Sequence, residues 1–89
     1  MLYVAFLPII DQEKNTALRP AHLEYINDLY KQGKVVMAGP FTDKKGGLVM
    51  YKADTPEEAR QLAEADPVVV GGARTLELRE WNPLELPLK

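Results

Sequence analysis

The order of strand-like and helix-like segments narrows the fold of this 89-residue chain more than any other feature. Apolar runs rich in β-forming residues alternate with stretches of helical spacing, and Gly or Pro residues separate them. The order is strand, helix, strand, strand, helix, strand. The predicted strands are residues 2–7, 34–38, 47–52 and 73–81, and the predicted helices are residues 19–32 and 55–66.

Two helix starts are predicted from proline and capping residues. Thr55-Pro56-Glu57-Glu58 is a capping box with proline at the first helical position. Arg19-Pro20 indicates a second start, which makes residues 11–18 a polar connection. Gly33 is expected as a left-handed cap, and the second helix ends at Asp66-Pro67, because a residue before proline is disfavoured in the α region.

This order predicts an α+β domain of the ferredoxin-like class, βαββαβ. Right-handed crossovers place two helices on one face of a four-stranded antiparallel sheet and leave the other face bare. Residues 1–89 are too few for two independent cores, so we expect a single domain. The apolar sets expected on the bare face, depending on register, are Tyr3, Ala5 and Leu7, or Val36 and Ala38, or Val49 and Tyr51.

Self-association is the expected way of covering that face. A small domain buries a modest share of its surface, and this chain has no cysteine with which to form a disulfide. An apolar sheet face is rarely left in water. We therefore expect a homodimer or a higher homo-oligomer.

Charge and composition exclude several classes of function. With 11 basic and 13 acidic side chains the net charge is -2, so nucleic acid is not an expected partner. Residues 1–10 are apolar, but no basic residues precede them and they are too few to span a bilayer, so no membrane partner is expected. The absence of cysteine fits a reducing compartment and predicts a cytoplasmic protein.

The composition also predicts neither a metal nor a cofactor. A single histidine without cysteine cannot build a zinc site of the usual composition, and no carboxylate metal motif is present. The pairs Gly46-Gly47 and Gly71-Gly72 lie outside any phosphate-loop or dinucleotide pattern, so nucleotide binding is not expected.

His22 is the first candidate for chemistry. At ~100° per residue it shares the apolar stripe of its predicted helix with Ile26 and Leu29, so its ring faces the sheet. A half-buried imidazole has a pKa that its surroundings easily move across neutrality, as a general acid or base requires. The alternative is a packed histidine that is hydrogen-bonded to a carbonyl.

Asp66 is the second candidate, at the end of the second predicted helix. In the functional interpretation its carboxylate orients His22, because a base works better when a carboxylate fixes its tautomer. In the other interpretation it caps backbone N–H groups of residues 68–70. Both helices lie on one face of the predicted sheet, so this arrangement allows contact between Asp66 and His22 without requiring it.

Four further residues are candidates for binding a small-molecule substrate or ligand. Arg19, at the predicted start of the first helix, could hold an anionic group with help from the positive end of that helix. Gly39-Pro40 offers backbone access for a ligand, although a turn explains the pair equally well. Phe41 follows directly and could line a pocket, although aromatic residues mostly belong to the core or an interface.

Together these segments resemble the YciI-like family. The resemblance rests on the opening Met1-Leu2-Tyr3-Val4, on residues 19–23 and 33–40, and on Ala65-Asp66-Pro67 followed by Gly71. It spans nearly the whole chain and implies a subunit of the dimeric α+β barrel superfamily, in which ferredoxin-like subunits join their sheets back to back. The family is largely uncharacterised.

The resemblance implies an enzyme that uses a histidine–aspartate pair, here His22 and Asp66, without a cofactor. Relatives in the wider superfamily include muconolactone isomerases and small cofactor-free monooxygenases, which implies compact, often aromatic or lactone-like substrates. Val68 stands where many relatives carry an aromatic residue, and the loop at residues 41–46 is short. We therefore expect proton transfer in an elimination, isomerisation or hydrolysis, with a non-catalytic binding module or a structural homo-oligomer as alternatives.

Overall fold

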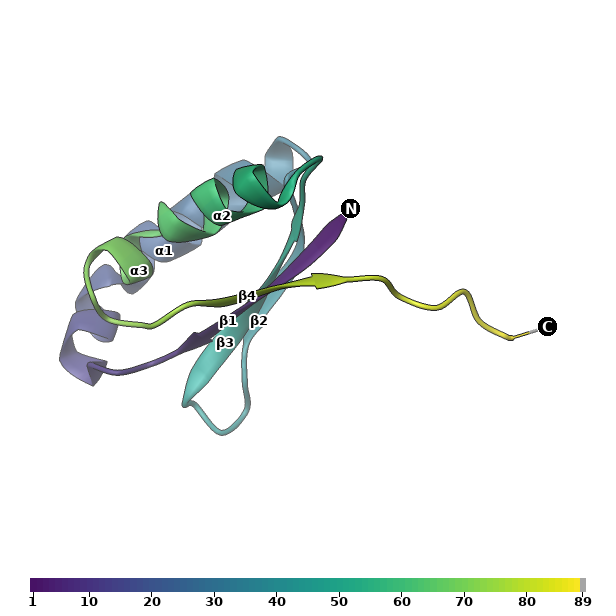
Figure 1. The fold of residues 1–89 in the computed structure, drawn as a ribbon. Coiled ribbons are helices and arrows are strands. Elements are labelled where there is room, and N and C mark those ends of the chain that lie inside the picture. The colour runs from purple at the N-terminus through teal and green to yellow at the C-terminus, as the bar shows by residue number, and fades with distance from the viewer. Residues whose placement is uncertain (89) are drawn as a thin grey trace.

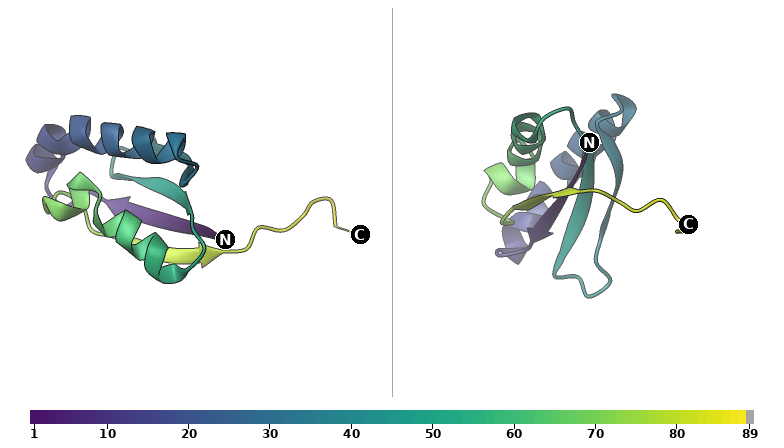
Figure 2. Two further views of the ribbon diagram at one scale, coloured as in Figure 1. Left: turned by 90° about the horizontal axis from the view of Figure 1, so that it is seen from above. Right: turned by 45° about the vertical axis from the view of Figure 1, so that its right-hand side comes forward.

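The structure, a computed structural model, describes residues 1–88 and places every helix on one face of a four-stranded antiparallel sheet (Figures 1 and 2). The sheet order is β2-β3-β1-β4, which confirms the predicted ferredoxin-like α+β fold. The elements are β1 (Leu2–Pro8), α1 (Gln12–Lys31), β2 (Val35–Pro40), β3 (Gly46–Lys52), α2 (Pro56–Glu64), α3 (Pro67–Val70) and β4 (Glu77–Trp81).

Helix α1 begins earlier than the sequence pattern predicts. Asp11 is its N-cap and accepts a hydrogen bond from the Lys14 N–H at 3.0 Å, so residues 12–18 are helical and not a connection. Pro20 lies inside the helix, where it lacks the N–H that would bond four residues back. The prediction of a start at Arg19-Pro20 was wrong because a proline typical of a first turn is tolerated here within a long, well-capped helix. Arg19 is therefore remote from the positive end of α1.

The other helix boundaries follow their local signals more closely. Gly33 has φ +79°, the predicted left-handed cap, and the Thr55 side chain accepts the Glu58 N–H at 3.1 Å, the predicted N-cap. Helix α2 ends at Glu64, before the predicted end at Asp66-Pro67. The short helix α3 then begins at Pro67, in a segment where no helix was predicted.

The helix-facing side of the sheet holds the core. Register pairs Tyr3 with Tyr51 and Ala5 with Val49, so these side chains share one face and are buried under the helices. The prediction that they point away from the helices was therefore wrong. A shift of one residue in the assumed register moves a whole strand to the other face. Ala38 pairs with Val49 on the same side, whereas Val36 lies at a β-bulge.

The opposite face carries no helix. Residues of the other parity in β1, β3 and β4 line a shallow, mostly apolar concavity of about 450 Å³ there. Its apolar lining residues are Val4, Phe6, Leu48, Met50 and Trp81. The sheet thus has a bare face, as predicted, but with different residues on it.

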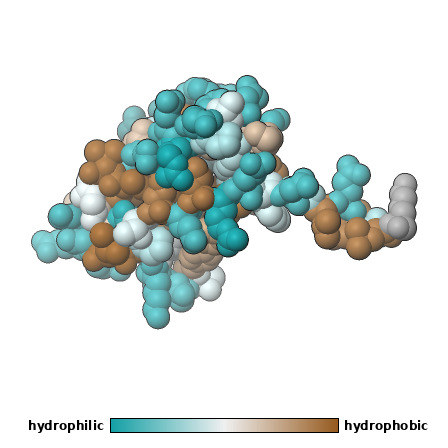
Figure 3. All heavy atoms as spheres, in the orientation of Figure 1, coloured by the Kyte–Doolittle hydropathy of each residue, from teal (hydrophilic) through white to brown (hydrophobic). Residues whose placement is uncertain are grey.

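The chain leaves the sheet after β4. This strand begins at Glu77 and not at Ala73, since Arg74 forms only an isolated bridge with Ile9. Beyond Trp81 the tail projects from the body and exposes apolar side chains (Figure 3). No helix in residues 1–88 is long and apolar enough to cross a membrane.

Candidate functional site

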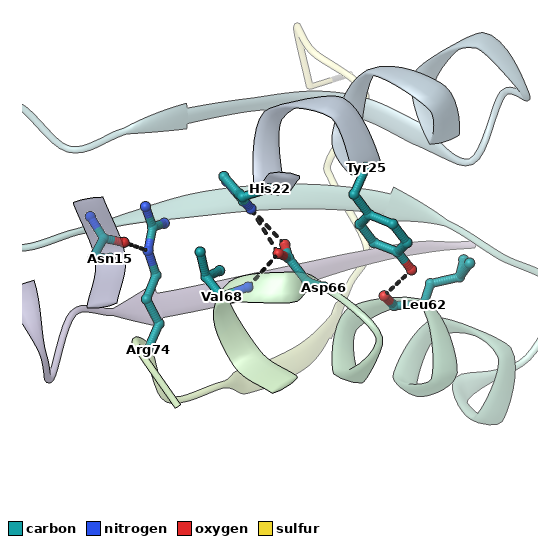
Figure 4. A network of polar contacts seen from close by, with 7 residues as sticks. All are labelled: Asn15, His22, Tyr25, Leu62, Asp66, Val68 and Arg74. Carbon is teal, nitrogen blue, oxygen red and sulfur yellow. Dashed lines mark hydrogen bonds and ion pairs between the residues drawn. The ribbon is translucent and has the colours of Figure 1, made fainter. Parts of the chain in front are cut away.

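His22 and Asp66 form a buried pair between α1 and α3 (Figure 4). Both carboxylate oxygens lie 2.8 Å from Nδ1 of His22. The Asp66 side chain is fully buried, and its Oδ1 also accepts the Val68 N–H at 3.1 Å. The two interpretations of Asp66 thus coexist, because one carboxylate both caps α3 and holds the imidazole.

The local sequence explains why the two side chains meet. Asp66 is the N-cap of α3, and Pro67 at the first helical position fixes the turn that points its carboxylate toward α1. Helix α1 packs against α3, and Gly71 ends α3 against the side chain of Leu18. A Cβ at Gly71 would require the tip of that leucine side chain to shift, so the glycine lets the two helices meet without this rearrangement.

The imidazole borders a small cavity. With Nδ1 held by Asp66, Nε2 is the ring nitrogen that remains for another partner, and His22 lines a cavity of about 170 Å³ between α1 and the sheet. Pockets for drug-sized ligands run to roughly 300–1,000 Å³. This one fits a smaller molecule, and its lining includes Arg19, Leu23, Ile26, Ala38, Gly39, Pro40, Val49 and Arg74.

The structure brings most of the predicted binding residues to this cavity. Arg19, Gly39 and Pro40 line it together with His22, while Asp66 lies behind the ring. Phe41 lies apart, on an adjoining cavity of about 560 Å³ that also reaches Arg19 and Pro40. Arg19 reaches the site from the middle of α1, so the positive end of the helix dipole does not assist it in binding an anion, contrary to the prediction.

Arg74 and Asn15 are site residues that the sequence analysis missed. Arg74 is buried, lines both cavities, and donates from Nε to Oδ1 of Asn15 at 2.7 Å. Arg74 has the same parity as Leu76 and Leu78 in the predicted strand 73–81, so alternation along that strand could have placed the arginine on the same face as the two leucines. Asn15 was not identified as a site residue because it precedes the predicted helix start.

The electrostatics of the site reflect burial beside the Asp66 carboxylate. Burial lowers the pKa of the Arg74 guanidinium below its usual value, while Asp66 raises it and Arg19 lowers it again. Burial and, secondarily, Asp66 raise the pKa of the phenols of Tyr25 and Tyr51. Arginine nevertheless remains protonated in proteins. The site therefore contains one buried carboxylate, two cations and an imidazole.

Such an arrangement can move a proton. A carboxylate on Nδ1 favours the tautomer with the proton on that atom, which leaves a lone pair on Nε2. An imidazole held in this way can accept a proton from a molecule in the cavity and later return it. No group of three His, Asp or Glu side chains suited to a metal ion occurs within the described residues 1–88.

Comparison with known proteins identifies relatives across nearly the whole chain. The profile of the YCII-related domain matches residues 1–82. Protein YjpA of Bacillus subtilis (strain 168) is 38% identical over 61 residues, covering 68% of this chain and 72% of YjpA. Protein YciI of Escherichia coli O6:H1 is 32% identical over 84 residues, covering 81% of this chain and 86% of YciI.

A solved structure shows the same fold. The 5-chloro-2-hydroxyhydroquinone dehydrochlorinase TftG of Burkholderia phenoliruptrix AC1100, in complex with 2,5-dihydroxybenzoquinone, superposes with a TM-score of 0.78. The superposition covers 92% of this chain and 94% of TftG, at 21% sequence identity. With the profile match over residues 1–82, these comparisons show that the chain belongs to the YCII-related domain family.

Proposed function

We propose that this protein is a cofactor-independent enzyme in which His22, oriented by Asp66, transfers a proton on a small organic substrate. The reaction class is an elimination, an isomerisation or a hydrolysis. The observation that carries the proposal is the buried pair itself, with both oxygens of Asp66 at 2.8 Å from Nδ1 of His22 and the ring at a cavity wall. A carboxylate with no exposed surface would be costly without such a partner.

The chemistry of the structural neighbour favours elimination among the three classes. TftG is a dehydrochlorinase, so its reaction removes hydrogen chloride from a small ring. In an elimination here, Nε2 of His22 accepts a substrate proton, and the electron pair of the broken bond enters the new double bond. The leaving group departs with its own bonding pair, and the imidazolium then releases its proton to water.

Chloride release from chlorinated hydroxyhydroquinones, 5-chloro-2-hydroxyhydroquinone included, tests the proposal. We expect turnover by the wild type, its loss in His22→Ala, and its retention in Asn27→Ala, a matched control at an exposed position of α1. A second panel of small lactones, followed by NMR, covers isomerisation and hydrolysis. Turnover that survives His22→Ala would sink the mechanism.

The same panels separate the two alternatives. A compound that binds in the cavity and is recovered unaltered would indicate a non-catalytic binding module. No binding, together with a loss of stability in the His22→Ala/Asp66→Ala variant, would indicate a structural homo-oligomer in which the two side chains only satisfy each other.

We also propose that a second copy of the chain covers the bare sheet face. Support comes from the apolar lining of its concavity, which includes Trp81 at 48% exposure, and from Met37 at 62% exposure, which pairs with the lining residue Met50. Residues 1–89 are proposed to act as one domain, since β1 and β4 pair strands from the two ends of the chain. The cysteine-free composition supports a cytoplasmic location.

A further inference from the structure

Arg74 presents a buried charge that the proposed proton transfer does not use. The residue is 5% exposed, and its side chain reaches from the segment before β4 toward α1, into the layer that also holds His22 (Figure 4). Within residues 1–88 its guanidinium has one hydrogen-bond partner, Asn15, and no ion pair. A guanidinium carries five N–H donors, so most of them remain for another acceptor.

Neighbouring residues position the guanidinium group of Arg74. The Asn15 amide donates to Gln12 Oε1 at 3.4 Å, which leaves its oxygen for Nε of Arg74 at 2.7 Å. On the sheet side, a Cβ at Gly47 would lie 3.3 Å from Nη1 of Arg74 and 2.9 Å from the Gly39 carbonyl oxygen. The glycine therefore leaves room for the guanidinium next to β3.

Arg74 lies at the wall of the space beside His22. Arg74 lines the 170 Å³ cavity together with His22 and Arg19, and it also lines the adjoining cavity with Arg19. Burial lowers the pKa of Arg74, the Asp66 carboxylate raises it, and the charge of Arg19 lowers it. Asp66 attracts Arg74 but is itself engaged by His22 and the Val68 N–H, and Arg74 has no ion-pair partner within residues 1–88. An anion bound at Arg74 would therefore offset both its desolvation and its repulsion from Arg19.

The geometry points to Arg74, held by Asn15 and assisted by Arg19, as the receptor for an anionic oxygen of the substrate on which His22 acts. The substrate class is therefore a small organic anion, a carboxylate or a phenolate, compact enough for the cavity. This inference rests on the proposed function, because it places the anion in the cavity of the His22–Asp66 pair. Arginine suits this task since its planar fork can bind a carboxylate through two parallel hydrogen bonds.

Benzoate and its neutral analogue benzamide test the inference through the ring signals of His22, the only histidine. We expect benzoate to bind the wild type and to shift these signals, and benzamide to bind far more weakly. In Arg74→Met, benzoate binding should weaken roughly tenfold to a hundredfold, as for loss of charge-assisted hydrogen bonds. The matched control is Arg60→Met, which removes an exposed arginine of α2 and should leave binding unchanged.

The comparison of benzoate with benzamide on the wild type keeps the inference falsifiable even if Arg74→Met fails to fold. Equal affinity for the two compounds, or undiminished benzoate binding by a folded Arg74→Met, would overturn the anion site. The proposed function can fail separately. If benzoate binding depends on Arg74 but no substrate is turned over, Arg74 is an anion receptor and the proposed proton transfer is wrong. If Arg74→Met turns over substrate with an unchanged KM, the enzymatic function stands and Arg74 is not the anion receptor.

Discussion

Asp66 holds His22 symmetrically, with both carboxylate oxygens 2.8 Å from the same ring nitrogen, Nδ1. The N–H of Val68 anchors the carboxylate from the other side at 3.1 Å. Because three groups on two helices fix one another, the ring has little freedom to turn. The pair is thus organised before any substrate arrives, which is the condition for efficient proton transfer.

Replacing Asp66 with asparagine should change the tautomer of His22. The amide keeps an oxygen for the Val68 N–H, but its NH₂ group then donates to Nδ1, so the ring proton moves to Nε2. We expect turnover to fall by roughly 10²–10⁴-fold. Imidazole ¹⁵N chemical shifts measure the tautomer directly, and Glu64→Gln, an exposed carboxyl of α2, should leave the shifts as they are. An unaltered spectrum in Asp66→Asn would mean that Asp66 does not set the tautomer.

Tyr51→Phe should stabilise the protein. The Tyr51 hydroxyl is buried and has no hydrogen-bond partner within residues 1–88, so its removal relieves a desolvation cost of about 1 kcal/mol. Tyr25→Phe is the matched control with the opposite sign, because the Tyr25 hydroxyl donates to the Leu62 carbonyl at 2.7 Å. Its loss should lower the free energy of unfolding by about 1 kcal/mol. Urea denaturation measures both changes, and destabilisation by Tyr51→Phe would contradict the unpaired hydroxyl.

Stability should fall in alkaline solution. Burial raises the pKa of Tyr25 and Tyr51 above the usual 10.0 in the folded state. Below that value both states are protonated and the protein keeps its full stability; above it, the unfolded state loses protons first. Tm should therefore decline from about pH 9 to about pH 11, and less steeply in Tyr51→Phe. Identical slopes for wild type and Tyr51→Phe would show that this phenol is not responsible.

Phe6→Glu should disrupt the proposed dimer. The side chain lies in the concavity of the bare sheet face, where a second copy would bury it and where an unpaired carboxylate would be costly. Sedimentation velocity at micromolar concentration should show a dimer for the wild type and a monomer for Phe6→Glu. Val70→Glu, at an exposed apolar position of α3 on the helix side, should remain dimeric. A monomeric wild type would remove the dimer model altogether.

The sequence predicts the architecture well because each element carries its own local signal. The capping box at Thr55, the glycine cap at Gly33 and the apolar stripe that includes His22 depend only on neighbouring residues. Crossover handedness then places both helices on one face. The inward position of His22 follows from the apolar stripe of its helix, whereas the proximity of Asp66 depends on the docking of α1 against α3, which the sequence left open.

The remainder depends on contacts that local patterns do not contain. Which face Tyr3 and Tyr51 occupy is set by strand register, and one residue of slip reverses it. The start of α1 was hidden because Pro20 is more typical of a first turn than of a helix interior. Asn15 was lost with that boundary, and Arg74 was overlooked because a charged residue among inward leucines is not expected without a partner.

His22 belongs to the connection between β1 and β2, and Asp66 belongs to the connection between β3 and β4. Neither half of the chain contains the pair, so it comes into being only where α1 and α3 dock. A chimera that joins residues 1–45 of one family member to the second half of another can therefore keep the fold and still misalign the pair. Leu18 and Gly71 meet at that contact, so a chimera would bring together a Leu18 position and a Gly71 position from different proteins.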